Sequence, residues 1–260
     1  VESRLNFLKI VANILGDARK KIIYEERLYN SAYFDQATKL ANRNMLKMRL
    51  QQMIDHAKES ERTAIIDIEL ENLRMINDTF GHSTGEQIMI KSAAILEDLS
   101  EGCCDISRVG EGEFVVVMPH VKNKEQIENS VKRLLTAFSH PISTATGIEA
   151  LFVVVHLGIS IYPDDGKDAD TLLKNADLAR YEAENTNEKI VFYTERLESH
   201  IAENTLFTNR LFRSLEHDEF FLEFQPQVSC ETGKTVGIEA LLRWTSDGNT
   251  RVPPDRFIPI

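Results

Sequence analysis

The segment Arg108–Phe114, with the sequence Arg-Val-Gly-Glu-Gly-Glu-Phe, constrains the fold of this chain more than any other. Two short runs rich in β-branched and aromatic residues flank its centre, Ile106 to Val109 and Phe114 to Met118, and such runs favour strands. Glycines and glutamates alternate between them, which is typical of a tight turn that joins antiparallel strands. We therefore predict a β-hairpin with an acidic tip.

Strand-like and helix-like segments alternate on both sides of this hairpin. Apolar runs predict strands at 63–68 and 151–161, and amphipathic spacing predicts helices at 85–99, 125–139 and 171–184. This alternation indicates an α/β arrangement in which helices cover a sheet and the hairpin supplies antiparallel neighbours. A further helix at 195–216, with an apolar stripe at Leu197, Ile201, Leu206 and Leu211, would connect to the last part of the chain.

The N-terminal segment has a helical seam suited to pairing with a second helix. Its apolar residues are spaced by three and four positions and are Leu8, Val11, Leu15, Ala18 and Ile22. Gly16 near the middle of this segment weakens the prediction of a coiled coil, so packing of the helix on its own domain is the alternative to a dimerising coil.

Composition excludes several classes of function. The net charge of −11 argues against non-specific binding to nucleic acid or to an anionic membrane, since both need a basic surface. Cys103, Cys104 and Cys230 have neither metal-binding nor redox spacing, and no apolar run reaches the roughly 18 residues of a membrane span. We expect a cytoplasmic fragment, because it begins at Val1, of a longer protein that other segments could tether to the inner membrane.

Several motifs, in order, resemble those of the GGDEF domain, the fold of diguanylate cyclases, which condense two GTP molecules into cyclic di-GMP. The Arg108–Phe114 hairpin resembles the family's signature, and four further segments resemble its other motifs: Asp35–Arg43, Ile76–Glu86, Gly158–Pro163 and Ala176–Tyr181. The resemblance covers about Tyr33 to Tyr193. It implies an α/β (α+β) fold of the nucleotidyl-cyclase type, with a mostly antiparallel central sheet flanked by helices.

A second resemblance begins after the first. Phe224–Val228, Glu239–Trp244 and Val252–Ile260 resemble the opening of an EAL domain, a phosphodiesterase that linearises cyclic di-GMP. The expected organisation is an N-terminal helix or coiled-coil linker at 1–32, a GGDEF domain at 33–193, a connecting helix at 194–217 and the truncated start of an EAL barrel at 218–260.

The resemblance assigns divalent-cation binding in a cyclase to two carboxylates, because Mg²⁺ or Mn²⁺ takes oxygen ligands and bridges phosphate oxygens. The first position falls on Glu69, where the family has Asp, and the second falls on Gly112, which has no side-chain oxygen. Glu113 does not simply replace it, since successive strand residues point to opposite faces. An exposed acidic turn is the alternative explanation of Glu111 and Glu113. We expect no catalytic residues in this altered signature, which comprises Gly110, Glu111, Gly112, Glu113 and Phe114.

The resemblance also predicts how a nucleotide would be held. The family binds the terminal phosphates with a Lys and an Arg at the positions of Glu184 and Glu188, so two cations have become two anions. Each charge-assisted contact is worth roughly 1–3 kcal/mol, and a like charge is unfavourable by a similar amount. Asn77 and Glu86, by contrast, match the amide and the acid that read guanine. A GTP pocket of reduced affinity and a simple turn before a helix both explain these two residues.

The EAL-like residues are intact as far as they go. Glu239 matches a metal-ligating glutamate, Arg243 resembles the arginine that contacts the substrate phosphate, and Gln225 lies where a polar contact to the ligand is expected. They need further groups from the rest of the barrel. Cyclic di-GMP would therefore bind only in a complete EAL domain. Mg²⁺ or Mn²⁺ would accompany a bound nucleotide or bound cyclic di-GMP, and the GGDEF fold itself needs no cofactor.

These observations predict a cyclic di-GMP signalling protein. Its GGDEF domain would be catalytically silent and would act as a regulatory, GTP-sensing and homodimerising module for a downstream EAL phosphodiesterase. The fragment would then not be an enzyme, although its parent would be one. Two alternatives remain, a weak diguanylate cyclase and a dimerisation spacer that binds no nucleotide.

Overall fold

The chain forms two compact units, Val1–Leu197 and Glu198–Ile260, and each is described by itself. The computed structural model describes residues 2–58, 60–100, 102–145, 150–246 and 250–258, with side chains described from residue 15 onward. Helix α7 (Glu195–Glu216) contains the boundary between the units.

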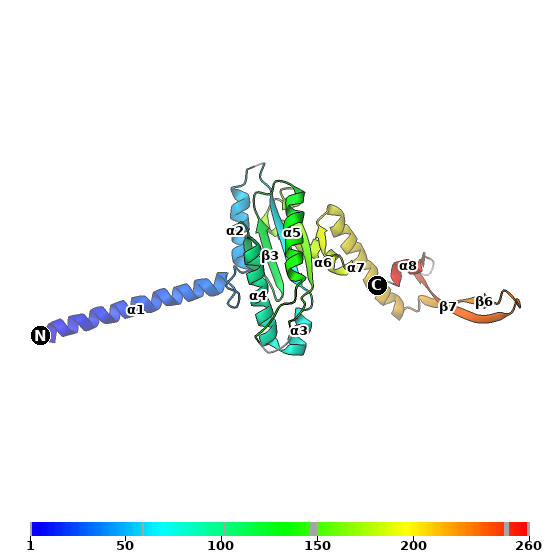
Figure 1. Ribbon diagram of the computed structural model, residues 1–260, viewed down its shortest axis with the longest axis horizontal. Coiled ribbons are helices and arrows are strands. Elements are labelled where there is room, and N and C mark those ends of the chain that lie inside the picture. The colour runs from blue at the N-terminus through cyan, green and yellow to red at the C-terminus, as the bar shows by residue number, and fades with distance from the viewer. Residues whose placement is uncertain (1, 59, 101, 146–149, 247–249, 259–260) are drawn as a thin grey trace. The chain divides into compact units, whose positions relative to one another are not determined.

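The first unit is built around a sheet that helices flank (Figure 1). The sheet has five strands in the order β2-β3-β1-β4-β5. Neighbouring strands are antiparallel except β4 and β5, which are parallel. The strands are β1 (Thr63–Leu70), β2 (Asp105–Arg108), β3 (Glu113–Met118), β4 (Val155–Tyr162) and β5 (Ile190–Phe192). The helices are α1 (Glu2–Tyr33), α2 (Arg43–Asp55), α3 (Leu73–Phe80), α4 (His82–Ser100), α5 (Lys124–Phe138) and α6 (Ala169–Asn185).

Helices cover both faces of this sheet. Because successive strand residues face opposite sides, Ile66 and Ile68 of β1 pack with α3, α4 and α5, whereas Ile65 packs with α2 and α6. The sheet therefore lies between two hydrophobic cores. This arrangement confirms the predicted fold class, a mostly antiparallel sheet flanked by helices.

Side-chain caps define where three of the helices begin. The Asn42 side chain accepts hydrogen bonds from the backbone N–H groups of Asn44 and Met45 at the start of α2. Asn123 and Asp168 do the same for α5 and α6, each accepting from the N–H group three residues later. Such caps satisfy donors that the first turn of a helix leaves unpaired.

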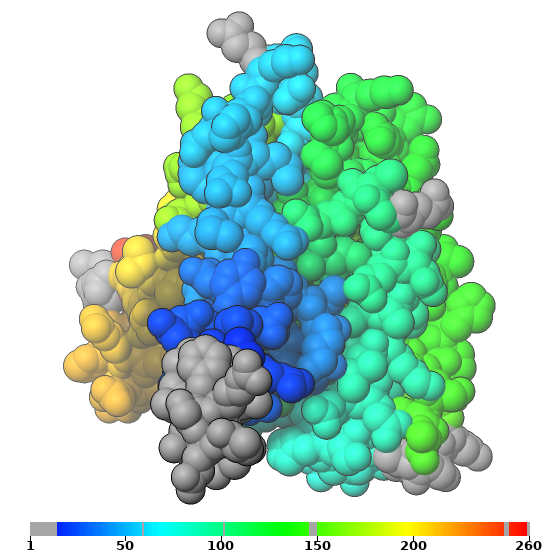
Figure 2. Space-filling view, turned by 90° about the vertical axis from the view of Figure 1, so that its left-hand side faces the viewer, coloured from blue at the N-terminus to red at the C-terminus, as the bar shows by residue number. Residues whose placement is uncertain are grey.

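The end of α1 is fastened to the sheet beside the hairpin. Arg108 of β2 donates to both carboxylate oxygens of Asp35, at 3.1 Å each, and its backbone N–H donates to the carbonyl of Ala41 at 2.9 Å. The Asp35 carboxylate also accepts from the N–H and hydroxyl groups of Thr38. Figure 2 faces this junction, with the blue atoms at the end of α1 next to the light-blue atoms of α2.

The second unit carries a three-stranded antiparallel sheet, β6 (Phe220–Val228), β7 (Thr235–Ser246) and β8 (Thr250–Val252), followed by α8 (Pro254–Phe257). Trp244 is fully buried at one end of this sheet, and the rings of Phe207, Phe220 and Phe257 pack against it with centroids 5.2–5.6 Å away. The indole N–H of Trp244 donates to Glu219 at 3.1 Å. This second sheet is compatible with the predicted fragment of an EAL domain.

The elements differ from the sequence-based expectation in a few places. The strand predicted from Leu151 begins only at Val155, because the Asn72 side chain bonds the Phe152 carbonyl and the Val154 N–H and holds this stretch outside the β4 ladder. In the first unit, the sequence did not predict α2, α3 or β5, and in the second unit it did not predict β8 or α8. In the N-terminal seam, Leu15 and Ile22 are exposed on α1, whereas the side chains of Leu8 and Val11 lie outside the described residues.

Candidate functional site

The hairpin tip holds Gly112 in a backbone conformation that favours glycine. Its φ is 89°, in the left-handed region that side chains rarely adopt. Its carbonyl accepts from the N–H of Leu70 at 2.8 Å, which ties the tip to the end of β1. A Cβ at this position would lie 3.3 Å from Leu73 Cδ2 and 3.4 Å from the Leu70 carbonyl oxygen. A carboxylate side chain would therefore be strained here as well as crowded.

Beside the tip lies a cavity of about 410 Å³ between the end of β1, α3 and the hairpin. The Asn77 amide points to the hairpin and donates to the Glu111 carboxylate at 3.0 Å. The predicted partner of Asn77, Glu86, is exposed on α4 and is not among the described residues that line the cavity. The residues that line it are Glu69, Leu70, Glu71, Leu73, Arg74, Asn77, Asp78, His82 and Glu111.

This cavity is acidic. Four of its lining residues are carboxylates, and Arg74 is the only lysine or arginine among the described residues that line it. A guanine ring offers N–H donors that an amide or a carboxylate suits, whereas phosphates would meet like charge. The arrangement thus favours recognition of a base over recognition of a triphosphate.

A second cluster of charges surrounds Arg180 between β1 and α6. Its side chain is only 10% exposed and contacts four carboxylates. Asp67 accepts at 3.4 Å and Asp177 at 2.6 Å, while Glu184 lies 3.8 Å away. The fourth is Glu69, the predicted metal position, which accepts from Nη1 of Arg180.

Burial perturbs the acids of this cluster. It raises the pKa of Asp67 to about 7 against the opposing charge of Arg180, and the charges of Asp177 and Glu113 raise it further. The pKa values of Glu113 and Asp177 are also raised, mainly by burial. Burial would raise the pKa of Asp35 as well, but its hydrogen bonds to Thr38 and Arg108 outweigh this and hold it below the ordinary value.

The other predicted positions take separate places around the cluster. Glu113 is the register partner of Glu69 across β1 and β3, so both residues face the same side of the sheet. Glu184 and Glu188 are exposed at and beyond the end of α6. The Glu188 carbonyl bonds Nδ1 of His156 at 2.8 Å, and Nε2 of His156 bonds Glu71 at 2.9 Å.

These residues do not fit the divalent cation that the family resemblance implies. Mg²⁺ and Mn²⁺ need several convergent oxygens, yet Gly112 supplies no side-chain oxygen and the Glu69 carboxylate is already paired with Arg180. Among the described residues, no group of three or more His, Cys, Asp or Glu side chains is arranged to hold a metal ion. No chemical step is therefore assigned to a metal at this site.

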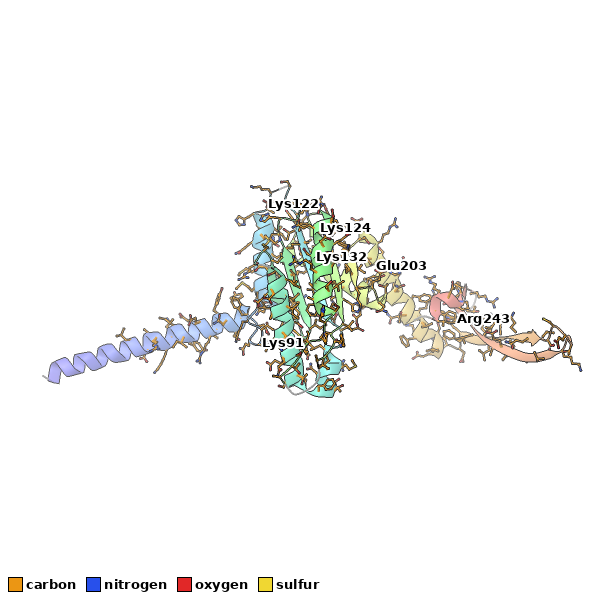
Figure 3. All side chains as sticks on the ribbon, viewed as in Figure 1. Lys91, Lys122, Lys124, Lys132, Glu203 and Arg243 are labelled. Carbon is orange, nitrogen blue, oxygen red and sulfur yellow. The ribbon has the colours of Figure 1, made fainter. Side chains whose placement is uncertain are left out.

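The predicted EAL residues share one face of the second unit's hairpin. Gln225 and Glu239 are direct register partners, as are Phe221 and Arg243, and paired residues that are an even number of positions apart along a strand lie on one face. Arg243, labelled in Figure 3, donates to Glu223 at 2.7 Å. The arginine is thus held by a neighbouring acid.

Sequence reasoning missed Asp67 and Arg180. A signal was present, because Asp67 interrupts the apolar strand Thr63–Leu70, and a buried carboxylate needs a charged partner. The partner itself was not predictable from local pattern, since Arg180 lies 113 residues further along the chain.

Comparison with known proteins identifies the family. The profile of the "Diguanylate cyclase, GGDEF domain" family matches residues 32–189, and that of the "EAL domain" family matches residues 208–260. The chain therefore belongs to the GGDEF domain family, with a short EAL match after the GGDEF domain, as its motifs predicted.

Two bacterial relatives match nearly the whole of this chain. An uncharacterized signaling protein of Caulobacter vibrioides is 30% identical over 94% of this chain and 30% of its own length. The bifunctional diguanylate cyclase/cyclic di-GMP phosphodiesterase MucR of Pseudomonas aeruginosa is 27% identical over 100% of this chain and 37% of its own length. The chain thus spans about a third of these relatives.

Among solved structures, the isolated GGDEF domain of TpbB (YfiN) from Pseudomonas aeruginosa matches with a TM-score of 0.63. It is 22% identical, and the match covers 65% of this chain and 99% of that domain. This similarity shows the fold alone.

Within the described residues, none of the helices combines the length and apolar character that a membrane crossing requires.

Proposed function

We propose that this GGDEF domain makes no cyclic di-GMP and instead regulates a downstream EAL phosphodiesterase in cyclic di-GMP signalling. The observation that carries the proposal is the state of the two cation positions of a cyclase. Gly112 has no carboxylate and sits in a glycine conformation, and Glu69 is paired with Arg180. Without two carboxylates to hold them, no cations would orient the triphosphate and activate the attacking hydroxyl for condensation.

The charges at the two positions that the family resemblance assigns to the terminal phosphates support the same function. Glu184 and Glu188 stand where cations would bind the terminal phosphates, and Glu184 belongs to the acidic cluster around Arg180. Each like-charge contact weakens phosphate binding by an amount on the order of 1 kcal/mol or more. Turnover would therefore be unfavourable even if a cation were supplied.

A nucleotide-sensing version of this role is favoured by the cavity beside Asn77. Its volume of about 410 Å³ is in the range of small-molecule sites. Bound GTP would act on the signal only through different affinities for the states of the protein. In this proposal, rotation or separation of the paired N-terminal helices alters how the EAL domains of the two subunits contact each other.

The decisive experiment is a cyclase assay on the purified chain with GTP and either Mg²⁺ or Mn²⁺. We expect no cyclic di-GMP by mass spectrometry, with an active GGDEF protein as the positive control. Formation of cyclic di-GMP would establish the weak-cyclase alternative and overturn the proposal.

Calorimetric titration with GTP separates sensing from a pure spacer. The wild-type chain should release or absorb heat on GTP addition, and Asn77→Ala should abolish this signal because it removes the amide that faces the cavity. Asn44→Ala is the matched control, since the exposed Asn44 amide donates to the carbonyl of Ala32 on α1 and lies outside the cavity. A flat trace for the wild-type chain would leave only the dimerisation spacer.

A further inference from the structure

Arg180 is enclosed by acids from two elements. Asp67 and Glu69 approach it from β1, and Asp177 and Glu184 approach it from its own helix. A buried charge persists only where nearby partners compensate it. The four carboxylates therefore form a place for a cation, and the chain supplies that cation itself.

We infer that the guanidinium of Arg180 takes the place of a divalent cation at Glu69 and keeps Mg²⁺ and Mn²⁺ out of this domain. The inference deepens the proposed function, since it rests on Glu69 as the surviving cation position of a cyclase. Arg180 is a positioning residue in this account. It acts on metal binding through the oxygens that it occupies and through its own positive charge.

Two physical effects oppose a divalent ion at Glu69 while Arg180 is present. The Glu69 oxygen that contacts Nη1 of Arg180 is no longer a free ligand. A divalent ion on the same carboxylate would also lie within a few ångströms of the guanidinium, in surroundings that screen charge poorly. Arginine stays protonated at every relevant pH, so this block is permanent.

The acids nevertheless have unused capacity to bind a cation. Asp67 is 7% exposed, and its Oδ1 is buried without a hydrogen-bond partner among the described residues. Asp67 also lines a small cavity of about 70 Å³ together with Glu113, Asp177 and one cation, Arg43. Removing Arg180 would thus leave Asp67, Glu69 and Asp177 without the cation that they now contact, and Oδ1 of Asp67 has no other hydrogen-bond partner among the described residues.

The backbone holds Arg180 in this place. Gly158 of β4 lies directly against α6, and a Cβ on it would overlap the backbone of Ala176 and of Arg180. The close approach of α6 to β4 fixes the origin of the arginine side chain. The guanidinium itself is held by its contacts with the four carboxylates.

Manganese binding to the whole chain tests the inference without any nucleotide. Free Mn²⁺ is followed by electron paramagnetic resonance while the ion is titrated into the protein. We expect Arg180→Leu to gain one Mn²⁺ site that binds at least tenfold more tightly than any site in the wild-type chain. This gain should disappear in Arg180→Leu/Glu69→Gln.

Two matched variants separate charge from a general effect of arginine removal. Arg180→Lys keeps a positive charge among the acids, so it should remain without the new site. Arg62→Leu removes an arginine that pairs with exposed Asp164 at 2.6 Å elsewhere in the same unit, and it should also gain nothing. A new site in either variant would contradict the role of the Arg180 charge.

Loss of Arg180 alone leaves Asp67 buried without its partner, which is strongly destabilising. If Arg180→Leu does not fold, Asp67→Asn/Arg180→Leu removes both buried charges and keeps Glu69, Asp177, Glu184 and a side-chain oxygen at position 67. It should gain the same Glu69-dependent site. Absence of that gain in a folded variant, or a Glu69-dependent Mn²⁺ site in the wild-type chain, would overturn the inference. Cyclic di-GMP formation would instead overturn the proposed function, so the two failures are distinguishable.

Discussion

At the scale of single residues, Asp67 shows how burial sets the protonation of a side chain. It lies in the middle of β1, and its pKa is raised to about 7 chiefly because burial disfavours the charged form. Arg180 opposes this shift by its positive charge but satisfies only one of the two carboxylate oxygens. The carboxyl group thus changes its protonation within the physiological pH range.

The stability of the domain should therefore depend on pH through Asp67. Between the ordinary pKa of 3.8 and about 7, the folded state keeps a proton on Asp67 that the unfolded state has lost. The contribution of Asp67 to the free energy of unfolding thus falls as pH rises through this range, by up to about 1.4 kcal/mol per pH unit. Urea unfolding of the wild-type chain and Asp67→Asn should show a stability difference with this slope.

Asp35→Asn is the control for this pH series. The pKa of Asp35 is lowered, not raised, so its contribution is present above the ordinary pKa of 3.8 and is lost as pH falls below it. Its profile should follow that of the wild-type chain from pH 5 to pH 8. If the difference between the wild-type chain and Asp67→Asn does not change between pH 4.5 and pH 8, Asp67 does not have a raised pKa.

At the scale of elements, the pair Asp35 and Arg108 joins the end of α1 to the strand that leads into the hairpin. Hydrogen bonds between charged groups contribute roughly 1.5–3 kcal/mol where they are partly buried. We expect Asp35→Ala to lower the free energy of unfolding by about this amount and to increase hydrogen exchange at residues 33–42. Asp170→Ala is the control, because its pair with Lys47 is exposed and should contribute at most about 1 kcal/mol. Equal losses in the two variants would exclude a special role for the junction.

The packing of α6 on β4 makes a second prediction at this scale. A methyl group at Gly158 would overlap the backbone of α6, and overpacking of this kind typically costs about 1–3 kcal/mol or more. Gly158→Ala should therefore lower the melting temperature of the domain. Gly16→Ala makes the same change on α1, where nothing lies within 4 Å, and should be neutral or slightly stabilising. An unchanged melting temperature in Gly158→Ala would show that α6 can move away from β4.

Most elements of the first unit were predictable because their signals are local. Apolar period and turn residues indicated the hairpin, β1 and the helices α4, α5 and α6. Helix α2 was missed although its cap, Asn42, is visible in the sequence, and α3 is only 8 residues long. Residues of the candidate site were predictable only where they belong to a family motif, as Gly112 does. The engagement of Asn77 by Glu111 and of Glu69 by Arg180 depends on tertiary contacts across 34 and 111 residues.

At the scale of the whole molecule, the proposed function requires that α1 pairs with a second copy of itself. The side chains of this helix are described from residue 15 onward, and those from residue 15 to residue 32 are all exposed. Leu15 and Ile22 are 64% and 62% exposed. Packing of this part on its own domain, the alternative left open by the sequence, would have buried these side chains. Their exposure therefore favours a partner helix.

Dimerisation through α1 should be sensitive to charge on this seam. Burial of a Leu or Ile side chain contributes about 1.5–3 kcal/mol, so Leu15→Glu/Ile22→Glu should weaken the dimer by on the order of 100-fold or more. Sedimentation equilibrium of the whole chain measures this shift. Lys20→Glu, on the face of the same helix opposite the seam of Leu15, Ala18 and Ile22, should leave the dissociation constant within about threefold, because its pair with Asp17 is exposed and an exposed charge contributes little. A dimer that persists unchanged in the double variant would place the contact elsewhere and remove α1 from the proposed signalling route.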